Sequence, residues 1–164
     1  QWVGSCSAKA MAVAPAEWRW YDLNQITPGD LAAEIRPTAV EQTTALLQQF
    51  ADQGGAIWAE GPVEGDFIVN FSMSIVPGDF TLTDDPRRVA DVLGQLGIPT
   101  GNGGTRDIGD GPVYYEVTDV GSGRAAATYV IPDGGYAISF TLTAPGGLGY
   151  SDLADQIAYT IQGC

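Results

Sequence analysis

The two cysteines, Cys6 and Cys164, are the residues of this chain whose type and spacing most directly suggest chemistry. Cys6 follows a small residue and has the aliphatic Val3 three positions before it, which is typical of the cysteine that receives a lipid in bacterial lipoproteins. The alternative is a disulfide, because two cysteines in an exported chain usually pair and chain ends often lie close together. Lipid attachment would make Cys6 the first residue of the mature protein, yet five residues precede it. We therefore expect a Cys6–Cys164 disulfide and keep lipid attachment at Cys6 as the alternative.

The chain contains no histidine. Histidine is the usual general base and the commonest metal ligand, so its absence removes Ser-His-Asp and Cys-His mechanisms and most zinc sites. Catalysis would have to rest on carboxylates, which gather in two stretches: Glu60, Glu64 and Asp66, and Asp79, Asp84 and Asp85. Twenty acidic residues among 164 form such groups by chance. We expect no enzyme activity, no cofactor and no metal site, and keep a carboxylate-based hydrolase as a weaker alternative.

Two short motifs resemble catalytic or binding signatures without their required context. Gly121, Gly123 and Ala126 have the spacing of a dinucleotide-binding turn, but the residues that follow predict a strand where that motif requires a helix. Ser151 in GYSDL lacks both the second glycine of a nucleophile elbow and a histidine to activate it. We interpret the first motif as a hairpin turn and Ser151 as a helix cap.

Tryptophans are the candidate contact residues. Trp18 and Trp20 alternate within a predicted strand and therefore share one of its faces, either as core or as a recognition patch. Trp58 lies in a later predicted strand. We keep Trp18, Trp20 and Trp58 as possible contacts for a partner or a ligand.

Composition limits the partners. With 20 acidic and 7 basic residues the formal net charge is −13, which opposes nucleic acids and anionic lipid surfaces because both require Lys and Arg to displace counterions. We expect no nucleic acid and no direct membrane span, since no stretch reaches the roughly 18 apolar residues of a spanning helix.

Hydrophobic periodicity predicts one α+β domain. Helical patterns cover residues 36–55, 84–99 and 150–162, with Thr38, Asp84 or Asp85, and Ser151 as their caps. Alternating or continuous apolar patterns predict strands at 56–61, 66–76, 112–120, 124–132 and 135–144, the last three in a meander. We expect residues 1–10 to form an extended arm and 11–164 a single domain with an antiparallel sheet flanked by helices, an α/β/α sandwich.

Three stretches in this order resemble a known family: MAVAPAEWRWYDL, FIVNFSMSIV, and RAAATYVIPDGGYAISFTLTA followed by YSDLADQIAYTIQGC. They are similar to the opening strand, an early hairpin strand and the closing hairpin and helix of the PsbP-like fold, which includes the LpqN-type lipoproteins of mycobacteria. The resemblance covers residues 11–163 as a pattern of elements. It implies a sheet with helices on both faces and a non-enzymatic domain exported to the cell envelope, with no catalytic residues to carry over. Cys164 departs from the typical lipoprotein and favours the disulfide.

These observations together predict an exported protein on the extracellular, periplasmic or cell-wall side. We expect it to bind a protein partner in the cell envelope, for example as an accessory subunit of a membrane complex, as PsbP itself does. The alternative from another class is a carrier or sensor of a small apolar or cationic ligand at Trp18, Trp20 or Trp58.

Overall fold

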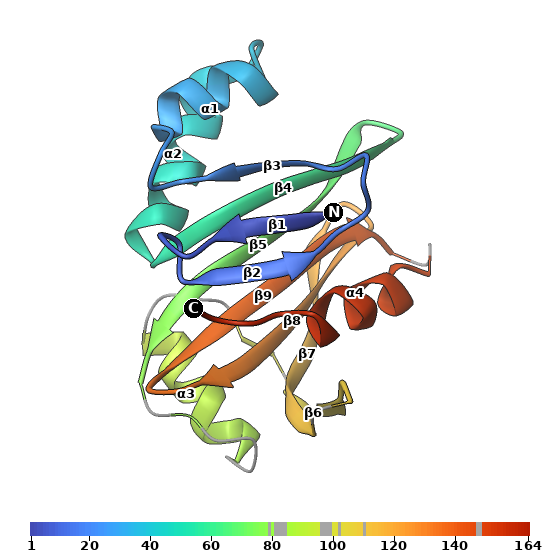
Figure 1. The fold of residues 1–164 in the computed structure, drawn as a ribbon. Helices are drawn as coiled ribbons and strands as arrows, with labels where there is room; N and C mark the ends of the chain where they lie inside the picture. The colour runs from blue at the N-terminus through green and yellow to red at the C-terminus, as the bar shows by residue number, and fades with distance from the viewer. Residues whose placement is uncertain (79, 81–84, 96–99, 102, 110, 147–148) are drawn as a thin grey trace.

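The fold was obtained as a computed structural model, which describes residues 1–164 apart from 79, 81–84, 96–99, 102, 110 and 147–148 (Figure 1). The described residues form nine strands and four helices. In chain order these are β1 (Trp2–Ser5), β2 (Ala10–Val13), β3 (Arg19–Asp22), α1 (Pro28–Ile35), α2 (Val40–Asp52), β4 (Gly55–Glu64), β5 (Phe67–Pro77), α3 (Pro86–Gln95), β6 (Gly104–Asp107), β7 (Pro112–Gly121), β8 (Arg124–Asp133), β9 (Tyr136–Pro145) and α4 (Tyr150–Tyr159).

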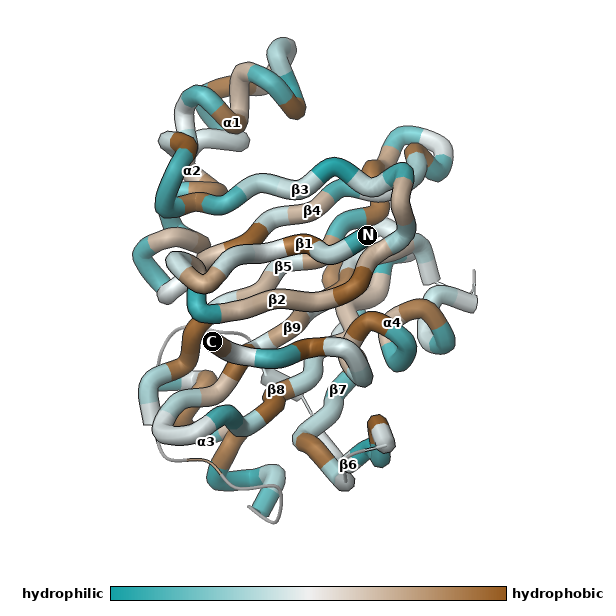
Figure 2. Tube along the Cα trace, in the orientation of Figure 1, coloured by the Kyte–Doolittle hydropathy of each residue, from teal (hydrophilic) through white to brown (hydrophobic). Residues whose placement is uncertain are grey.

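A seven-stranded antiparallel sheet is the centre of the fold. Its strand order is β3-β4-β5-β9-β8-β7-β6, so β7, β8 and β9 form the predicted meander and β9 returns to pair with β5. Figure 2 shows apolar and polar segments alternating along these strands. This alternation gives the sheet two faces of different composition.

One face of the sheet is closed. It carries large apolar side chains, among them Phe71, Tyr129 and Phe140, which are fully buried. The β1–β2 hairpin and α4 lie over it, in front of the sheet in Figure 1. Val3 of the hairpin and Ile157 of α4 are buried in the same core. We call this side, from the hairpin to α4, the closed face.

The other face is covered at its two ends. Leu31 of α1 and Leu47 of α2 pack together near β3 and β4. Val89 and Leu93 of α3 pack against Val76 of β5 at the opposite end. With helices here and α4 on the closed face, the predicted α+β sandwich is confirmed.

Between these helices the second face is built from short polar side chains. Register places Ser72, Thr141 and Thr128 side by side on β5, β9 and β8, with Asn70 and Thr143 in the next row. The hydroxyls of Thr128 and Thr141 lie 2.9 Å apart, within hydrogen-bond distance. We call this side, with α1, α2 and α3 at its ends, the open face.

The N-terminal residues differ from the prediction. Residues 1–10 are not a separate arm, because β1 pairs with β2 from Trp2↔Val13 to Ser5↔Ala10, so the predicted boundary after residue 10 falls within β2. Apolar residues at alternate positions of this stretch, such as Val3, Ala10 and Ala12, are buried in the core. Burial of that side of the hairpin is the physical reason that it joins the domain.

Two predicted helix caps are also corrected. Helix α2 begins at Val40 with Ala39 as its N-cap and no side-chain cap hydrogen bond, so Thr38 lies one residue before the N-cap. Gly149 caps α4 in a left-handed conformation, and Ser151 lies inside the first turn. Asp85 fulfils its predicted role, since its carboxylate accepts a hydrogen bond from the Arg87 N–H at 2.9 Å. The alternative cap of that helix, at residue 84, lies outside the described residues.

Candidate binding site

A cavity of about 500 Å³ lies on the open face, between the α1–α2 pair and the sheet. Helix residues from Ile35 to Leu47 form one wall, and side chains of β4, β5, β8 and β9 form the rest, with Val120 at the end of β7. We call it the Trp58 cavity. Its volume falls within the range of small-molecule and side-chain binding pockets.

The hollow exists because opposite faces of the same strands carry side chains of different size. Asn70, Ser72 and Thr143 line the cavity, whereas their neighbours Phe71 and Leu142 point to the closed face and fill it. Helix α2 leans on the sheet through Leu47, its buried apolar residue. Because the side chains of the sheet below α2 are short, the space between the helix and the sheet stays open.

Trp58 and Glu60 stand on the same side of β4 and form the polar corner of the cavity. The indole Nε1–H of Trp58 donates to Glu60 Oε1 at 3.4 Å, and Arg19 Nη2 donates to Glu60 Oε2 at 3.0 Å. Glu60 is only 4% exposed, so its charge is buried and paired with that of Arg19. The Phe50 ring meets Trp58 edge-on, with centroids 6.1 Å apart. These contacts hold the indole in place as a wall.

Arg124 forms the opposite corner. Its guanidinium lies over the Phe67 ring, 4.4 Å from the centroid, and both residues line the cavity. The nearest acidic partner is Asp66 at 4.0 Å, whose side chain is 97% exposed. Ion pairs with one fully solvated partner are weak, so stacking on Phe67 is the contact that positions Arg124.

Tyr21 extends the site beyond Trp58. It faces Trp58 in the β3–β4 register and packs in the α1–α2 cluster, while its hydroxyl donates to Glu34 at 3.0 Å. Burial, and next the hydrogen bond to Glu34, raise the pKa of Tyr21 to about 12. The phenol is therefore a neutral hydrogen-bonding group throughout the physiological pH range.

The three predicted tryptophan contacts do not come together. Trp18 is buried on the closed face, where its ring stacks on Phe71 with centroids 5.6 Å apart, and Trp20 is half-buried against the same core. Trp58 lies on the other face of the sheet and lines the cavity. Trp18 is thus a core residue, and Trp58 is the tryptophan that faces an open site.

The predicted carboxylate groups separate in the same way. Glu60 pairs with Arg19, Glu64 accepts a hydrogen bond from the Tyr150 hydroxyl at 3.0 Å, and Asp66 extends into solvent. Asp85 caps α3, while the other two acidic residues of that stretch, at positions 79 and 84, lie outside the described residues. In the described part of the chain, no cluster of three or more Cys, Asp or Glu side chains is arranged to hold a metal ion.

Four lining residues were not predicted from the sequence: Arg36, Leu46, Val120 and Arg124. Leu46 is an extra apolar residue beside the helical spacing of Val40 and Leu47, which is the signal that could have revealed it. The role of Arg124 has no comparable signal, because its position over Phe67 depends on the pairing of β8 with β9 and of β9 with β5.

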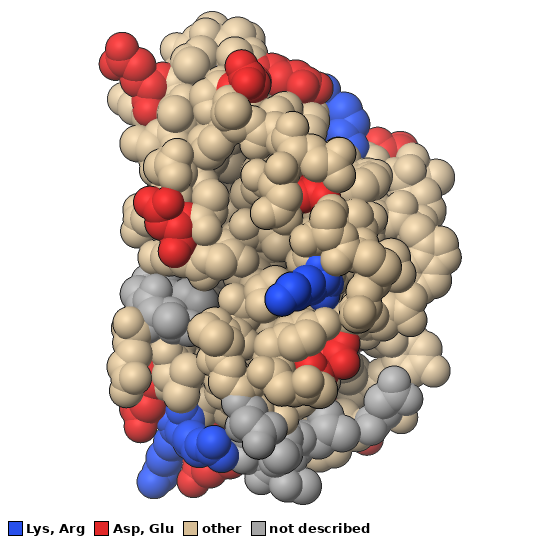
Figure 3. Space-filling model, turned by 60° about the vertical axis from the view of Figure 1, so that its left-hand side comes forward, with Lys and Arg blue, Asp and Glu red and all other residues tan. Residues whose placement is uncertain are grey.

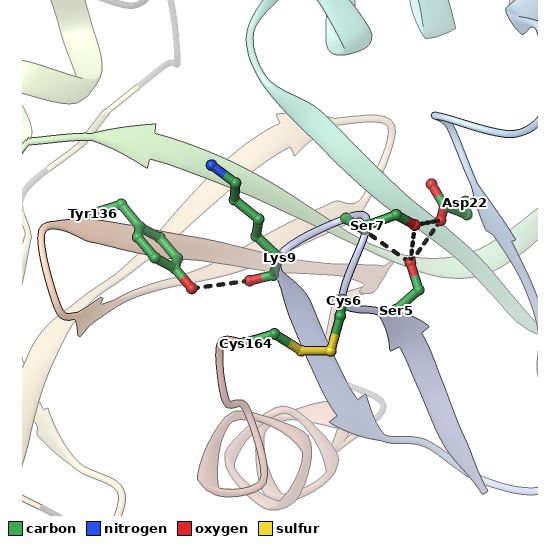
Figure 4. Close-up of a disulfide and its surroundings, with 8 residues drawn as sticks. Ser5, Cys6, Ser7, Lys9, Asp22, Tyr136 and Cys164 are labelled. Carbon is green, nitrogen blue, oxygen red and sulfur yellow. Dashed lines mark hydrogen bonds between the residues drawn. A yellow bond between two sulfur atoms is a disulfide. The ribbon is translucent and has the colours of Figure 1, made fainter.

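The cysteines are joined in the predicted Cys6–Cys164 disulfide, with Cα atoms 5.2 Å apart (Figure 4). A cysteine in this bond cannot carry a lipid thioether at the same time. Figure 4 also shows Ser5 and Ser7, on either side of Cys6, donating to Asp22 Oδ2 at 2.6 and 3.0 Å. The hairpin loop is thus fixed both to the chain end and to β3.

The C-terminal segment pairs with the hairpin along its outer strand. Main-chain hydrogen bonds join Met11 and Gln162 in both directions, at 2.9 and 3.0 Å. The disulfide is therefore the last of several links between the two chain ends on the closed face. None of the helices in the part of the chain that the structure describes combines the length and apolar character needed to cross a membrane.

Comparison with known proteins addresses the fold. No protein-family model and no curated protein sequence matches the chain. The crystal structure of a protein from Bacteroides thetaiotaomicron VPI-5482 is similar, with 15% sequence identity and a TM-score of 0.57 over 99% of this chain and 48% of that protein. The solution structure of cyanobacterial PsbP (CyanoP) from Synechocystis sp. PCC 6803 has 18% identity and a TM-score of 0.53 over 100% of this chain and 92% of CyanoP.

These likenesses show the fold. The chain has a PsbP-like α+β fold, as the sequence resemblance implied, and spans about half the length of the Bacteroides protein. The narrower LpqN-type assignment stays a prediction, because neither similar structure carries it.

Proposed function

We propose that this chain is a non-enzymatic, exported binding module of the LpqN type, which binds a protein partner in the cell envelope through the Trp58 cavity and its rim. An accessory subunit of a membrane complex is the role that such a module would fill. The observation that carries the proposal is an open cavity with two exposed apolar side chains, Leu46 and Val120, at its rim.

The rim distinguishes a protein partner from a small ligand. Leu46 of α2 and Val120 of β7 both line the cavity, yet they are 58% and 51% exposed. A small molecule inside the cavity would leave these outer surfaces in water. A protein segment that fills the cavity would also cover its rim and remove that apolar area from solvent, which favours association.

The absence of catalysis and the exported location are supported by the carboxylate contacts, the lack of histidine, the disulfide and the fold. The carboxylates Glu60 and Glu64 are engaged with different partners, and the chain has no histidine. The disulfide suits an oxidising compartment outside the cytosol. The PsbP-like fold supports the assignment because it is built without catalytic residues in the family that the sequence resembles.

Affinity capture from the envelope fraction of the producing organism tests the proposal. Wild-type protein is expected to retain a stoichiometric partner, and Leu46→Ser with Val120→Ser to lose it. Val117→Ser is the matched control, since Val117 is 56% exposed on the same strand but lies against a different hollow beside Tyr150. Capture that survives the rim substitutions, or is lost equally in the control, would contradict the proposal.

A carrier of a small apolar ligand is the second candidate, and the position of Trp58 supports it. The cavity has the volume of a ligand pocket and an indole in its wall. Its test is a change in tryptophan fluorescence with an uncharged apolar probe such as N-phenyl-1-naphthylamine, compared between wild type and Trp58→Phe. A response that is lost in Trp58→Phe while partner capture is unaffected by the rim variants would favour the carrier.

A further inference from the structure

We infer that the Trp58 cavity selects an acidic segment of its protein partner, with carboxylates of that segment at Arg36 and at Arg124 and an adjacent apolar side chain against Trp58. The inference rests on the proposed function, because it names the chemistry of the partner at the same cavity. It differs from the cationic ligand that the sequence left open as one alternative.

Charge at the cavity is the reverse of that of the whole molecule. Acidic residues outnumber basic ones by 20 to 7 in the chain. The charged residues that line the cavity are Arg36, Arg124 and Glu60, so arginine predominates there. Figure 3 shows acidic side chains at separate points from the α1 end to the α3 end of one side of the molecule, without a continuous patch.

The one acidic group of the lining is already neutralised. Arg19 donates to Glu60 at 3.0 Å, and the Trp58 indole donates to the other carboxylate oxygen at 3.4 Å. Glu60 is buried, whereas the Arg19 side chain is 60% exposed, so the buried carboxylate is charge-paired with an arginine that stays in contact with water. With Glu60 balanced by Arg19, Arg36 and Arg124 leave a net positive charge at the cavity.

The two lining arginines differ in how they are held, and both suit an incoming carboxylate. Arg124 is fixed by stacking on Phe67, and its ion pair with the solvated Asp66 is weak enough to exchange. Arg36 ends α1 and is exposed at the opposite wall. Guanidinium groups bind carboxylates through paired N–H donors, so two of them on one cavity select an anion over a cation.

Apolar side chains beside the arginines indicate that the bound segment also carries apolar residues. Leu46, Leu47 and Ile68 line the cavity together with Trp58 and Val120. A carboxylate alone would leave this surface in water. At physiological ionic strength the Debye length is about 8 Å, so the net charge of the chain is screened and the local arginines decide the interaction at contact.

Selection from a displayed library of random short peptides tests the inference on the intact, disulfide-bonded protein. Clones are counted only if their capture is lost in Leu46→Ser, which restricts them to the cavity. We expect these clones to be enriched in Asp and Glu next to Leu, Ile, Phe or Trp and depleted in Lys and Arg.

Arginine variants then measure the contribution of each positive charge to binding of the best acidic clone, made as a synthetic peptide. Arg36→Gln and Arg124→Gln are each expected to weaken its binding about fivefold, the upper end for an exposed ion pair. Arg124→Lys keeps the charge and should retain more of the affinity. Arg87→Gln, at an exposed arginine of α3 outside the cavity, should leave the affinity unchanged. Circular dichroism confirms that each variant is folded.

The outcomes separate the two proposals. Cavity-dependent clones that are rich in Lys or Arg, or that lack any charge bias, would overturn the inference and leave the proposed function standing. Acidic clones whose affinity is equal in Arg36→Gln, Arg124→Gln and wild type would also overturn it. A library without any Leu46-dependent clone would overturn the inference and the proposed function together.

Discussion

The two faces of the seven-stranded sheet differ in side-chain composition and in packing. On β9, Phe140 points to the closed face and is fully buried, while the next residue, Thr141, points to the open face and meets Thr128. The closed face is filled by aromatic and aliphatic side chains beneath the hairpin and α4. The open face keeps polar residues and the Trp58 cavity between its helices. This contrast indicates that stability is concentrated on the closed face and that the open face is free to bind.

The closed face also carries the links between distant parts of the chain. The disulfide joins residues 158 positions apart, and the Met11–Gln162 pairing lies next to it. Asp22 adds a third link, since it accepts hydrogen bonds from Ser5 and Ser7 of the hairpin. Loss of any of these links should therefore lower the free energy of unfolding and leave the Trp58 cavity on the other face unchanged.

Replacing both Cys6 and Cys164 with serine should have the largest effect. In the loop-entropy model a closed loop of this length stabilises the folded state by about 5 kcal/mol, because it restricts the unfolded chain. Chemical denaturation of the variant and of the wild type measures the difference. An unchanged unfolding midpoint would mean that the disulfide does not secure the closed face.

A pair of aromatic truncations compares the faces directly. Phe140→Ala should cost about 3–5 kcal/mol of unfolding free energy, because it leaves a cavity in a packed core. Trp58→Ala should cost about 1–2 kcal/mol, since the indole is half-buried beside existing space. Urea titration gives both values. Equal losses, or a larger loss for Trp58→Ala, would remove the distinction between the two faces.

Asp22→Asn should give a smaller loss that depends on pH. Burial alone would raise the pKa of Asp22, but the hydrogen bonds from Ser5, Asn24, Ser7 and Gln25 outweigh it and lower the pKa below its ordinary value. The ionised group is thus favoured in the folded state, and its removal should cost about 2 kcal/mol at neutral pH.

The sign of the Asp22 effect follows from that shift. Stability from a carboxylate with a lowered pKa is complete above its unfolded pKa, near 4, and is lost as the pH falls through the lower folded value. Unfolding free energies of wild type and Asp22→Asn should therefore converge as the pH is lowered below about 4. A difference that stays constant with pH would show that the charge of Asp22 does not hold the hairpin.

The smallest effect is expected on the polar floor of the open face. Thr128→Val or Thr141→Val alone leaves one hydroxyl without its partner and should cost about 1 kcal/mol. The double variant removes both hydroxyls and should return close to wild-type stability. Thermal melting of the three variants checks this. A double variant that is less stable than both single variants would assign the open face a role in stability.

Much of the fold could be predicted because its signals are local. The alternating apolar pattern over residues 66–76 predicted β5, and Asp85 as a cap predicted the start of α3. The caps of α2 and α4 were wrong, because an eligible Thr or Ser near a helix start does not fix the residue at which the helix begins.

Less of the site could be predicted, because its residues belong to distant segments. Trp58 was a candidate by residue type alone, whereas Arg36 and Arg124 are separated by 88 positions and line the same cavity only in the folded chain. Trp18 had the same signal as Trp58 in the sequence. Its place in the core was decided by the hairpin that covers the closed face.

The sequence by itself determined the strands with one apolar side, the antiparallel meander, the resemblance to the PsbP-like fold and the cysteine pair, because periodicity and residue type act over a few neighbouring positions. Tertiary structure decided which face is closed and that Arg36 and Arg124 line the same cavity. The β1–β2 hairpin and α4, from opposite ends of the chain, cover one face because both bury apolar side chains there. The other face keeps its cavity because only its two ends meet helices, and this depends on long-range packing that no local pattern encodes.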